Sequence, residues 1–231
     1  MEPIHRPRGF TLIEMLVVAA IIIVITGVIF SGRSQFNNSI LLSSTAYDIA
    51  LTMRDAETYG LGTRAASGAA SAGYGLDFTR AAPGTYTLFA DTNPAPGGTN
   101  ACHALPTNGA SAPNAYPGDC VYTAADTTVS NYTLGNGVTV SNFCAHTSVR
   151  WLCSTTCGAT SPCVAGSAQS QLDIVFLRPN ATPFIALSGT YQASQSINQA
   201  CLAISAPGNA TARYIYLSAS GQIIANATSC P

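Results

Sequence analysis

Phe10–Phe30 reads FTLIEMLVVAAIIIVITGVIF, a run of 21 residues in which Glu14 is the only charged side chain. A helix of about 20 apolar residues, at about 1.5 Å per residue, crosses a hydrocarbon core of about 30 Å. The run is longer than the apolar core of a cleavable secretory signal, which has about 7–15 residues, and no small-x-small cleavage site follows it. It therefore predicts a transmembrane segment over residues 10–30.

Two arginines stand on the short N-terminal side of this run. Residues 1–9 read MEPIHRPRG and carry Arg6 and Arg8. Positively charged residues that flank a membrane segment stay on the cytoplasmic side. We therefore expect a single-pass topology with a cytoplasmic N-terminus and the long C-terminal part across the membrane.

The composition excludes several classes of protein. The 231-residue chain has 8% charged residues, a net charge of −1, 47% hydrophobic residues and no lysine, whereas soluble domains carry about 25% charged residues. A broad basic surface for nucleic acid is absent, so nucleic acid is not an expected partner. Near-zero net charge with high apolar content also excludes disorder by charge repulsion.

Glu14 is the informative residue of the run. An ionisable side chain in a membrane helix is costly and usually has a partner, although near the edge it can also reach the headgroups. The sequence Arg8-Gly9-Phe10-Thr11-Leu12-Ile13-Glu14 resembles the processing motif of type IV pilins and type II secretion pseudopilins. The resemblance combines a short basic leader, glycine before the cut, phenylalanine after it, glutamate at the fifth mature position and an unbroken apolar helix.

This resemblance implies a processing step and an assembly contact. A prepilin peptidase is expected to remove residues 1–9 as a leader, cutting between Gly9 and Phe10, and to methylate the new amine of Phe10. Glu14 is then expected to pair with the Phe10 amine of a neighbouring subunit. Such a pair offsets the cost of two charges in a dry bundle of helices.

The helix is expected to continue well beyond the membrane. No proline occurs between Pro7 and Pro83, and Gly60 and Gly62 are stop signals. Residues 31–62 therefore form the expected amphipathic half of a long spine helix. Its apolar side chains fall near one stripe, Phe36, Ile40, Tyr47 and Leu51, with Leu42, Ile49 and Met53 beside it.

Residues 63–231 are expected to form a β head. Alternating apolar residues around a Pro-Gly turn predict a hairpin over residues 74–88, and residues 91–120 read as an irregular loop. Further strands are predicted at Gly137–Val140, Leu172–Leu177, Phe184–Leu187, Leu202–Ser205, Tyr214–Leu217 and Gln222–Ala225. The expected fold class is α+β, a long N-terminal helical spine packed on a mostly antiparallel head of one or two sheets, as in pilins.

A second resemblance lies in the C-terminal part. Leu172–Asn180, Cys201–Ser205 and Arg213–Ile223 look like the corresponding segments of H-type minor pseudopilins, whose heads end in a strand, a glycine turn and a last strand. Residues 91–170 fit no pattern of that group, and an insertion is one interpretation of them.

All the cysteines lie in the head, where the topology predicts an oxidising compartment and hence disulfides. Pairing of nearest neighbours predicts Cys102–Cys120, Cys144–Cys153, Cys157–Cys163 and Cys201–Cys230. The alternative is zinc, held by Cys153, Cys157 and Cys163 with Cys144 and His146 nearby. Paired C-x2-C spacing is absent, so no metal and no cofactor are expected.

No motif of an enzyme is present. The sequence has no G-x-S-x-G elbow and, without lysine, no phosphate-binding loop of the usual kind. Asp119 and Asp126 lack EF-hand spacing for calcium. The acidic residues of the head appear singly, with no carboxylate pair visible: Asp77, Asp91, Asp119, Asp126 and Asp173.

The expected function is that of a structural subunit. The chain reads as a minor pilin or pseudopilin of a type IV filament or a type II secretion pseudopilus. Its expected partners are other such subunits, the prepilin peptidase and the assembly machinery of the bacterial inner membrane, with the head in the periplasm. The alternative is a DNA-uptake or adhesive minor pilin, whose head would bind DNA through a local cluster such as Arg178 and Arg213.

Overall fold

The chain divides into two compact units, Met1–Ile40 and Leu41–Pro231. A computed structural model of the protein describes residues 9–62, 64–66, 72–93, 117–155, 168–178, 180–191, 197–208 and 211–230. One helix, α1 (Leu12–Leu61), passes through both units. This 50-residue helix confirms the expected spine.

The C-terminal end of α1 is shaped by two glycines. Gly62 donates its N–H to the Thr58 carbonyl at 3.0 Å and closes the last turn. A Cβ at Gly60 would collide with the Phe176 carbonyl, so only glycine allows the helix to approach the neighbouring strand this closely. Arg178 then donates its N–H to the Gly60 carbonyl at 3.3 Å.

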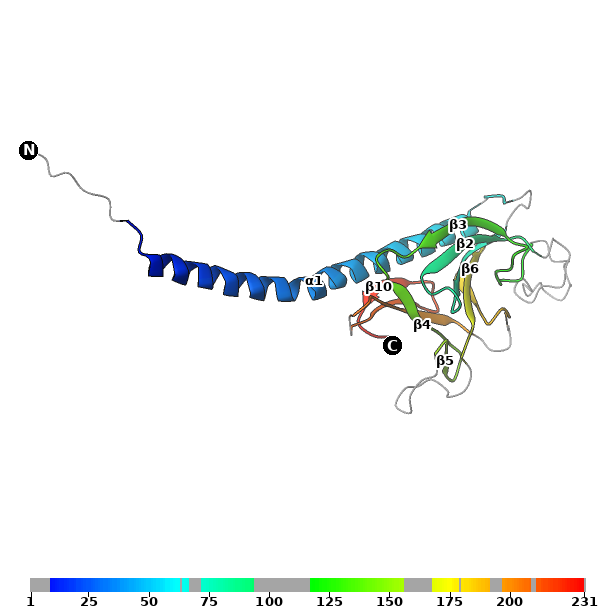
Figure 1. The fold of residues 1–231 in the computed structure, drawn as a ribbon. Coiled ribbons are helices and arrows are strands. Elements are labelled where there is room, and N and C mark those ends of the chain that lie inside the picture. The colour runs from blue at the N-terminus through cyan, green and yellow to red at the C-terminus, as the bar shows by residue number, and fades with distance from the viewer. Residues whose placement is uncertain are drawn as a thin grey trace, which may run out of the picture. The chain divides into compact units, whose positions relative to one another are not determined.

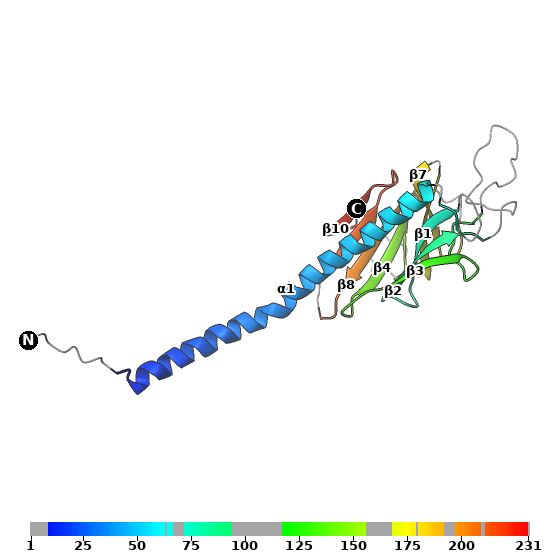
Figure 2. The ribbon, with the colours of Figure 1, turned by 90° about the horizontal axis from the view of Figure 1, so that it is seen from above.

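Strands make up the rest of the described head. They are β1 (Gly73–Thr79), β2 (Thr85–Asp91), β3 (Thr127–Thr133), β4 (Thr139–His146), β5 (Trp151–Cys153), β6 (Gln171–Leu177), β7 (Asn180–Leu187), β8 (Gln199–Ser205), β9 (Arg213–Leu217) and β10 (Ile223–Ala227). They form two five-stranded sheets, in the orders β3-β2-β1-β6-β7 and β10-β9-β8-β4-β5. All neighbouring strands within the two sheets pair antiparallel. Figures 1 and 2 show these strands beside the C-terminal half of α1. The expected α+β, pilin-like fold is thereby confirmed.

The helix contributes one face to a shared core with both sheets. The side chains of that face are fully or almost fully buried, and they are Leu42, Ala46, Ile49, Met53 and Ala56. Of the apolar stripe seen in the sequence, Ile40, Tyr47 and Leu51 are 54%, 59% and 60% exposed, and the residues beside it, Leu42, Ile49 and Met53, are the buried ones. The side chain of Phe36 lies outside the described residues. Alanines on the buried face let the helix lie close to the strands, and this leaves the larger residues of the neighbouring stripe outside.

The middle of the chain is built into both sheets. Residues 91–170 supply the edge strand β3 to one sheet, and β4 and β5 to the other. Strands β3 and β5 were not predicted, and β4 is longer than the predicted Gly137–Val140. The described residues 117–155 of this region are therefore part of the core architecture of the head.

Candidate functional site

The start of α1 holds the expected processing and assembly residues. Gly9 and Phe10 precede the helix, and both are exposed. Thr11 caps the helix: the Glu14 N–H donates to the Thr11 carbonyl at 3.1 Å and lies 3.3 Å from its Oγ1. A threonine followed three residues later by glutamate is the sequence signature of such a cap, which the sequence reasoning missed. The cap places the Glu14 carboxylate in the first turn, where the helix dipole favours a negative charge.

The apolar run that contains Glu14 is fully exposed. Leu12–Ile29 has a mean hydropathy of 2.9, and none of it is buried within the chain. Among the described residues it is the one stretch long and apolar enough to cross a membrane. A surface of this size and composition requires lipid or other apolar helices around it.

Two of the expected disulfides are present, Cys144–Cys153 and Cys201–Cys230. Cys120 is also disulfide-bonded, while Cys102, Cys157 and Cys163 lie outside the described residues. The register of the second sheet sets Cys144 opposite both Cys153 on β5 and Cys201 on β8. No described cysteine is free, and the described part holds no group of three metal-ligating side chains.

The two disulfides belong to a small apolar cluster on the outer side of this sheet. Trp151 is 7% exposed and packs with Cys144, Cys153 and Cys201. The His146 ring lies 4.9 Å from the Trp151 ring. His146 therefore contacts an aromatic side chain here.

A buried carboxyl pair lies in the other sheet. Asp77 on β1 and Asp173 on β6 are opposite each other in register, and they are 5% and 0% exposed. Burial raises the pKa of Asp77 to about 6. Burial, and then the facing Asp77, raise the pKa of Asp173 well above its usual range. The Gln171 amide donates to Asp173 at 3.0 Å and to the Tyr122 carbonyl at 3.1 Å.

Two further acids hold the segment that contains Tyr122. Asp91 accepts hydrogen bonds from the N–H groups of Asp119 and Cys120, at 3.1 and 2.7 Å. Asp126 accepts from the Thr123 N–H at 2.8 Å and from the Thr92 N–H at 3.0 Å. These carboxylates fix loop backbone, a role that the sequence, where they stand singly, did not show.

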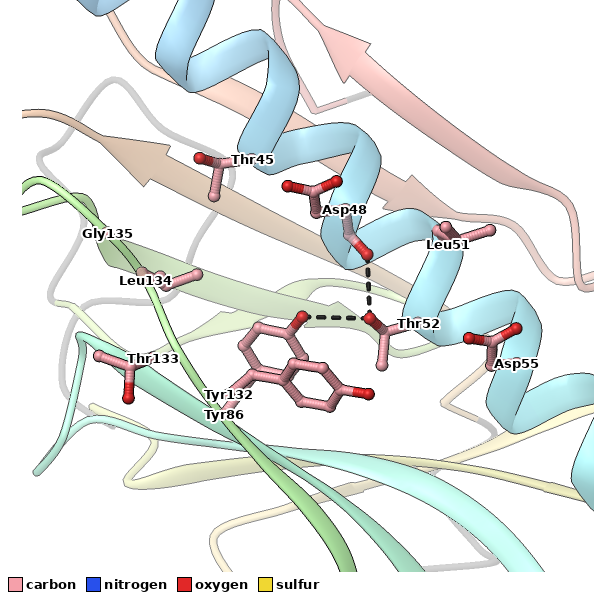
Figure 3. A pocket seen from close by; sticks show the side chains of 10 residues that line it. All are labelled: Thr45, Asp48, Leu51, Thr52, Asp55, Tyr86, Tyr132, Thr133, Leu134 and Gly135. Atoms are coloured by element: carbon pink, nitrogen blue, oxygen red, sulfur yellow. Dashed lines mark hydrogen bonds between the residues drawn. The ribbon is translucent and has the colours of Figure 1, made fainter.

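A groove lies in the head between α1 and strands β2 and β3 (Figure 3). Its volume is about 370 Å³. We call it the acidic groove and define it by Asp48, Leu51 and Asp55 of α1 with Tyr86 and Tyr132 of the strands. The two tyrosine rings are stacked, with centroids 4.8 Å apart and planes at 8°.

The architecture, an apolar N-terminal helix that continues into an antiparallel β head, is that of pilin-like proteins. Residues 4–30 match the family model of the prokaryotic N-terminal methylation motif, and this range includes Gly9, Phe10 and Glu14. The match supports a place for the chain in the type IV pilin and pseudopilin superfamily and points to a structural protein. Comparisons with curated proteins and with solved structures gave no match.

Proposed function

We propose that this chain is a structural subunit, a minor pilin or pseudopilin, of a type IV filament or a type II secretion pseudopilus. It is anchored in the bacterial inner membrane by residues 10–30, with residues 1–9 as its cytoplasmic leader and the head in the periplasm. The observation that carries the proposal is the apolar stretch Leu12–Ile29, which is not buried within the chain and has a single acid, Glu14, in the first turn of the helix.

The physical argument concerns the two charges at the end of this helix. Cleavage after Gly9 creates an amine on Phe10, four residues before Glu14. When helices leave lipid and pack against one another, an unpaired charge in that apolar environment costs several kcal/mol. Pairing Glu14 of one copy with the Phe10 amine of the next offsets both costs. The Thr11 cap holds the turn that positions the carboxylate.

Within this class, the C-terminal strands support an H-type pseudopilin. Strands β9 and β10 flank a turn in which Gly221 has a φ of 83°, and the Ser218 N–H donates to the Gln222 carbonyl at 2.9 Å. This is the strand, glycine turn and last strand of the resemblance. The identity of the neighbouring genes tests this choice: genes for a secretion ATPase and a secretin would support a secretion pseudopilus, whereas retraction or competence genes would support a pilus.

Substitution of Glu14 tests the assembly role. We expect Glu14→Ala and Glu14→Gln to be cleaved normally but to give about tenfold less filament, or less still, because the Phe10 amine loses its partner. The measurements are the mass of the mature N-terminus and the amount of filament sheared from cells. Glu57→Gln, an acid of the same helix within the head, is the matched control. Normal filament yield from the Glu14 variants contradicts the proposal.

A further inference from the structure

The acidic groove carries two carboxylates without partners. Asp48 is exposed and Asp55 half-buried, and neither carboxylate accepts a hydrogen bond or forms an ion pair within the described part of the chain. The two residues are seven positions apart, so about 10 Å of helix separates them and both lie on the groove side of α1 (Figure 3).

The floor of the groove is aromatic and held in place. The Tyr86 hydroxyl and the Thr52 hydroxyl are 3.1 Å apart and buried, which fixes Tyr86 against the helix. Tyr132 stacks on Tyr86, and Leu51, 60% exposed, stands on the rim. Tyr86 is 4% exposed and is also stacked on Phe78, so Tyr132 is the ring on which a guanidinium can stack while it pairs with the acids.

A guanidinium of this kind lies at the tip of the β4–β5 hairpin. We call Val149 and Arg150 the knob. Val149 is 82% exposed, and the exposed Arg150 side chain has no hydrogen bond or ion pair among the described residues. Buried Thr147 makes the turn rigid: its N–H donates to the Arg150 carbonyl at 2.8 Å, and its Oγ1 accepts from the Arg150 N–H at 3.1 Å. A preformed knob loses little entropy on binding.

The knob and the acidic groove have matching chemistry. Each combines an exposed apolar side chain with unpaired charge, and the charges are opposite in sign. In the described part of Leu41–Pro231, the large apolar residues that are exposed are few, and Leu51 and Val149 are two of them beside Tyr47 and Ile224. Exposed apolar side chains next to complementary charge are typical of protein contact surfaces.

The two surfaces cannot meet within one head. In Figure 1 the β5 hairpin projects from the side of the head remote from α1 and β3. A contact between two different surfaces of identical chains is heterologous, so each copy uses both surfaces, and the contacts either close into a ring or continue along an open array.

We propose that the knob of one copy docks in the acidic groove of a second copy, with Arg150 between Asp48 and Asp55 and Val149 against Leu51. The contact deepens the proposed function and rests on it. It gives neighbouring heads a defined lateral contact that is electrostatic in origin and therefore weakens as salt increases.

A charge exchange on the full-length chain in detergent micelles tests the contact. The knob variant carries Arg150→Glu, and the groove variant carries Asp48→Arg with Asp55→Asn. We expect each variant alone to self-associate about tenfold more weakly than wild type, as measured by sedimentation velocity over a range of concentrations. An equal mixture of the two variants is expected to regain association for two reasons. The intact knob of the groove variant meets the intact groove of the knob variant, and at the alternate contacts the introduced carboxylate meets the introduced guanidinium. Arg80→Glu is the control for a charge reversal elsewhere on the head; Arg80 is an exposed arginine at a hairpin turn, and its guanidinium donates to the Ser154 carbonyl at 3.2 Å.

The outcome separates this inference from the proposed function. If Glu14→Ala abolishes filaments while both charge variants associate like wild type, the subunit assembles and the knob–groove contact is wrong. The contact is also wrong if the variants are weak but their mixture stays weak, or if wild-type association does not change with concentration. If Glu14 is irrelevant but the mixture rescues association, the head contact stands and the filament assignment fails.

Discussion

Asp77 and Asp173 are the most unusual residues of the head, because two carboxyl groups face each other inside a sheet. The Asp77 Oδ1 and Asp173 Oδ2 atoms are buried and have no hydrogen-bond partner among the other described groups. The two side chains are within hydrogen-bond reach of each other, so one proton shared between them satisfies both. The folded state therefore holds protons that the unfolded chain releases.

The sign of the pH dependence follows from the raised pKa. Burial raises the pKa of Asp77 from 3.8 to about 6. Well below pH 3.8 the Asp77 carboxyl is protonated in the folded and the unfolded state alike, so its burial costs least there. As the pH rises from about 4 to about 6, the Asp77 carboxyl ionises first in the unfolded chain, so the free energy of unfolding falls, by on the order of 3 kcal/mol for Asp77 alone.

Replacing one carboxyl of the pair tests this account. The Asp77→Asn amide donates a hydrogen bond to Asp173 and cannot ionise. We expect the variant to match wild type at about pH 4, to be about 1–3 kcal/mol more stable at about pH 7 and to show a smaller slope between them. Thermal unfolding of the full chain in detergent at several pH values measures this. Asp48→Asn, at an exposed carboxylate, is the control. Asp91, whose pKa burial also raises, leaves part of the slope.

Helices and strands with regular apolar patterns could be predicted from the sequence. Strands that depend on hydrogen bonds to a neighbouring strand could not. Helix α1 follows from its apolar run, its lack of proline and its terminal glycines, and β6 and β8 from short apolar runs. Strand β3 reads TTVSNYT and is half-exposed at the sheet edge, so its hydrogen bonds to β2, and not burial, define it. The Asp77–Asp173 pair likewise depends on the register of β1 with β6, which joins segments far apart in the chain. The sequence gives one local sign of a buried acid: Asp173 stands inside the apolar strand pattern QLDIVFL.

The two disulfides of the second sheet constrain different elements. Cys144–Cys153 joins strands that already pair in register and closes a separation of 9 residues. Cys201–Cys230 ties the C-terminal end to β8 over a separation of 29 residues. Because Cys144 and Cys201 are opposite each other, removing one cysteine leaves a thiol beside the other disulfide, with which it can exchange. Each disulfide must therefore be removed as a pair.

Paired removal is expected to rank the two disulfides by loop length. In the chain-entropy description, loops of these sizes contribute about 3 kcal/mol for the shorter and about 4 kcal/mol for the longer. Cys201→Ala with Cys230→Ala should therefore lower the melting temperature more than Cys144→Ala with Cys153→Ala. Thermal unfolding measures the difference, and non-reducing peptide mapping checks that the remaining disulfide is intact. An equal loss, or the reverse order, contradicts the ranking.

At the scale of the whole molecule, folding energy and assembly surface are assigned to different parts of the chain. The buried core begins at Leu42, whereas the apolar side chains described before Ile40 are exposed. The unit Leu41–Pro231 thus contains every buried apolar contact of the described chain. The described apolar side chains before Ile40 therefore contribute exposed surface and little to the stability of the head.

This division predicts that the head folds without the N-terminal unit. A chain of residues 41–231 should be soluble without detergent, should contain the same disulfides and should unfold at nearly the melting temperature of the full chain, because it retains Leu42, Ile49 and Met53. A chain that begins at residue 55 is the matched comparison. It lacks those three side chains, and losing buried groups of this size costs about 2–5 kcal/mol each, so it should aggregate or bind a hydrophobic dye. A 41–231 chain that melts far below the full protein would show instead that the apolar half of α1 stabilises the head.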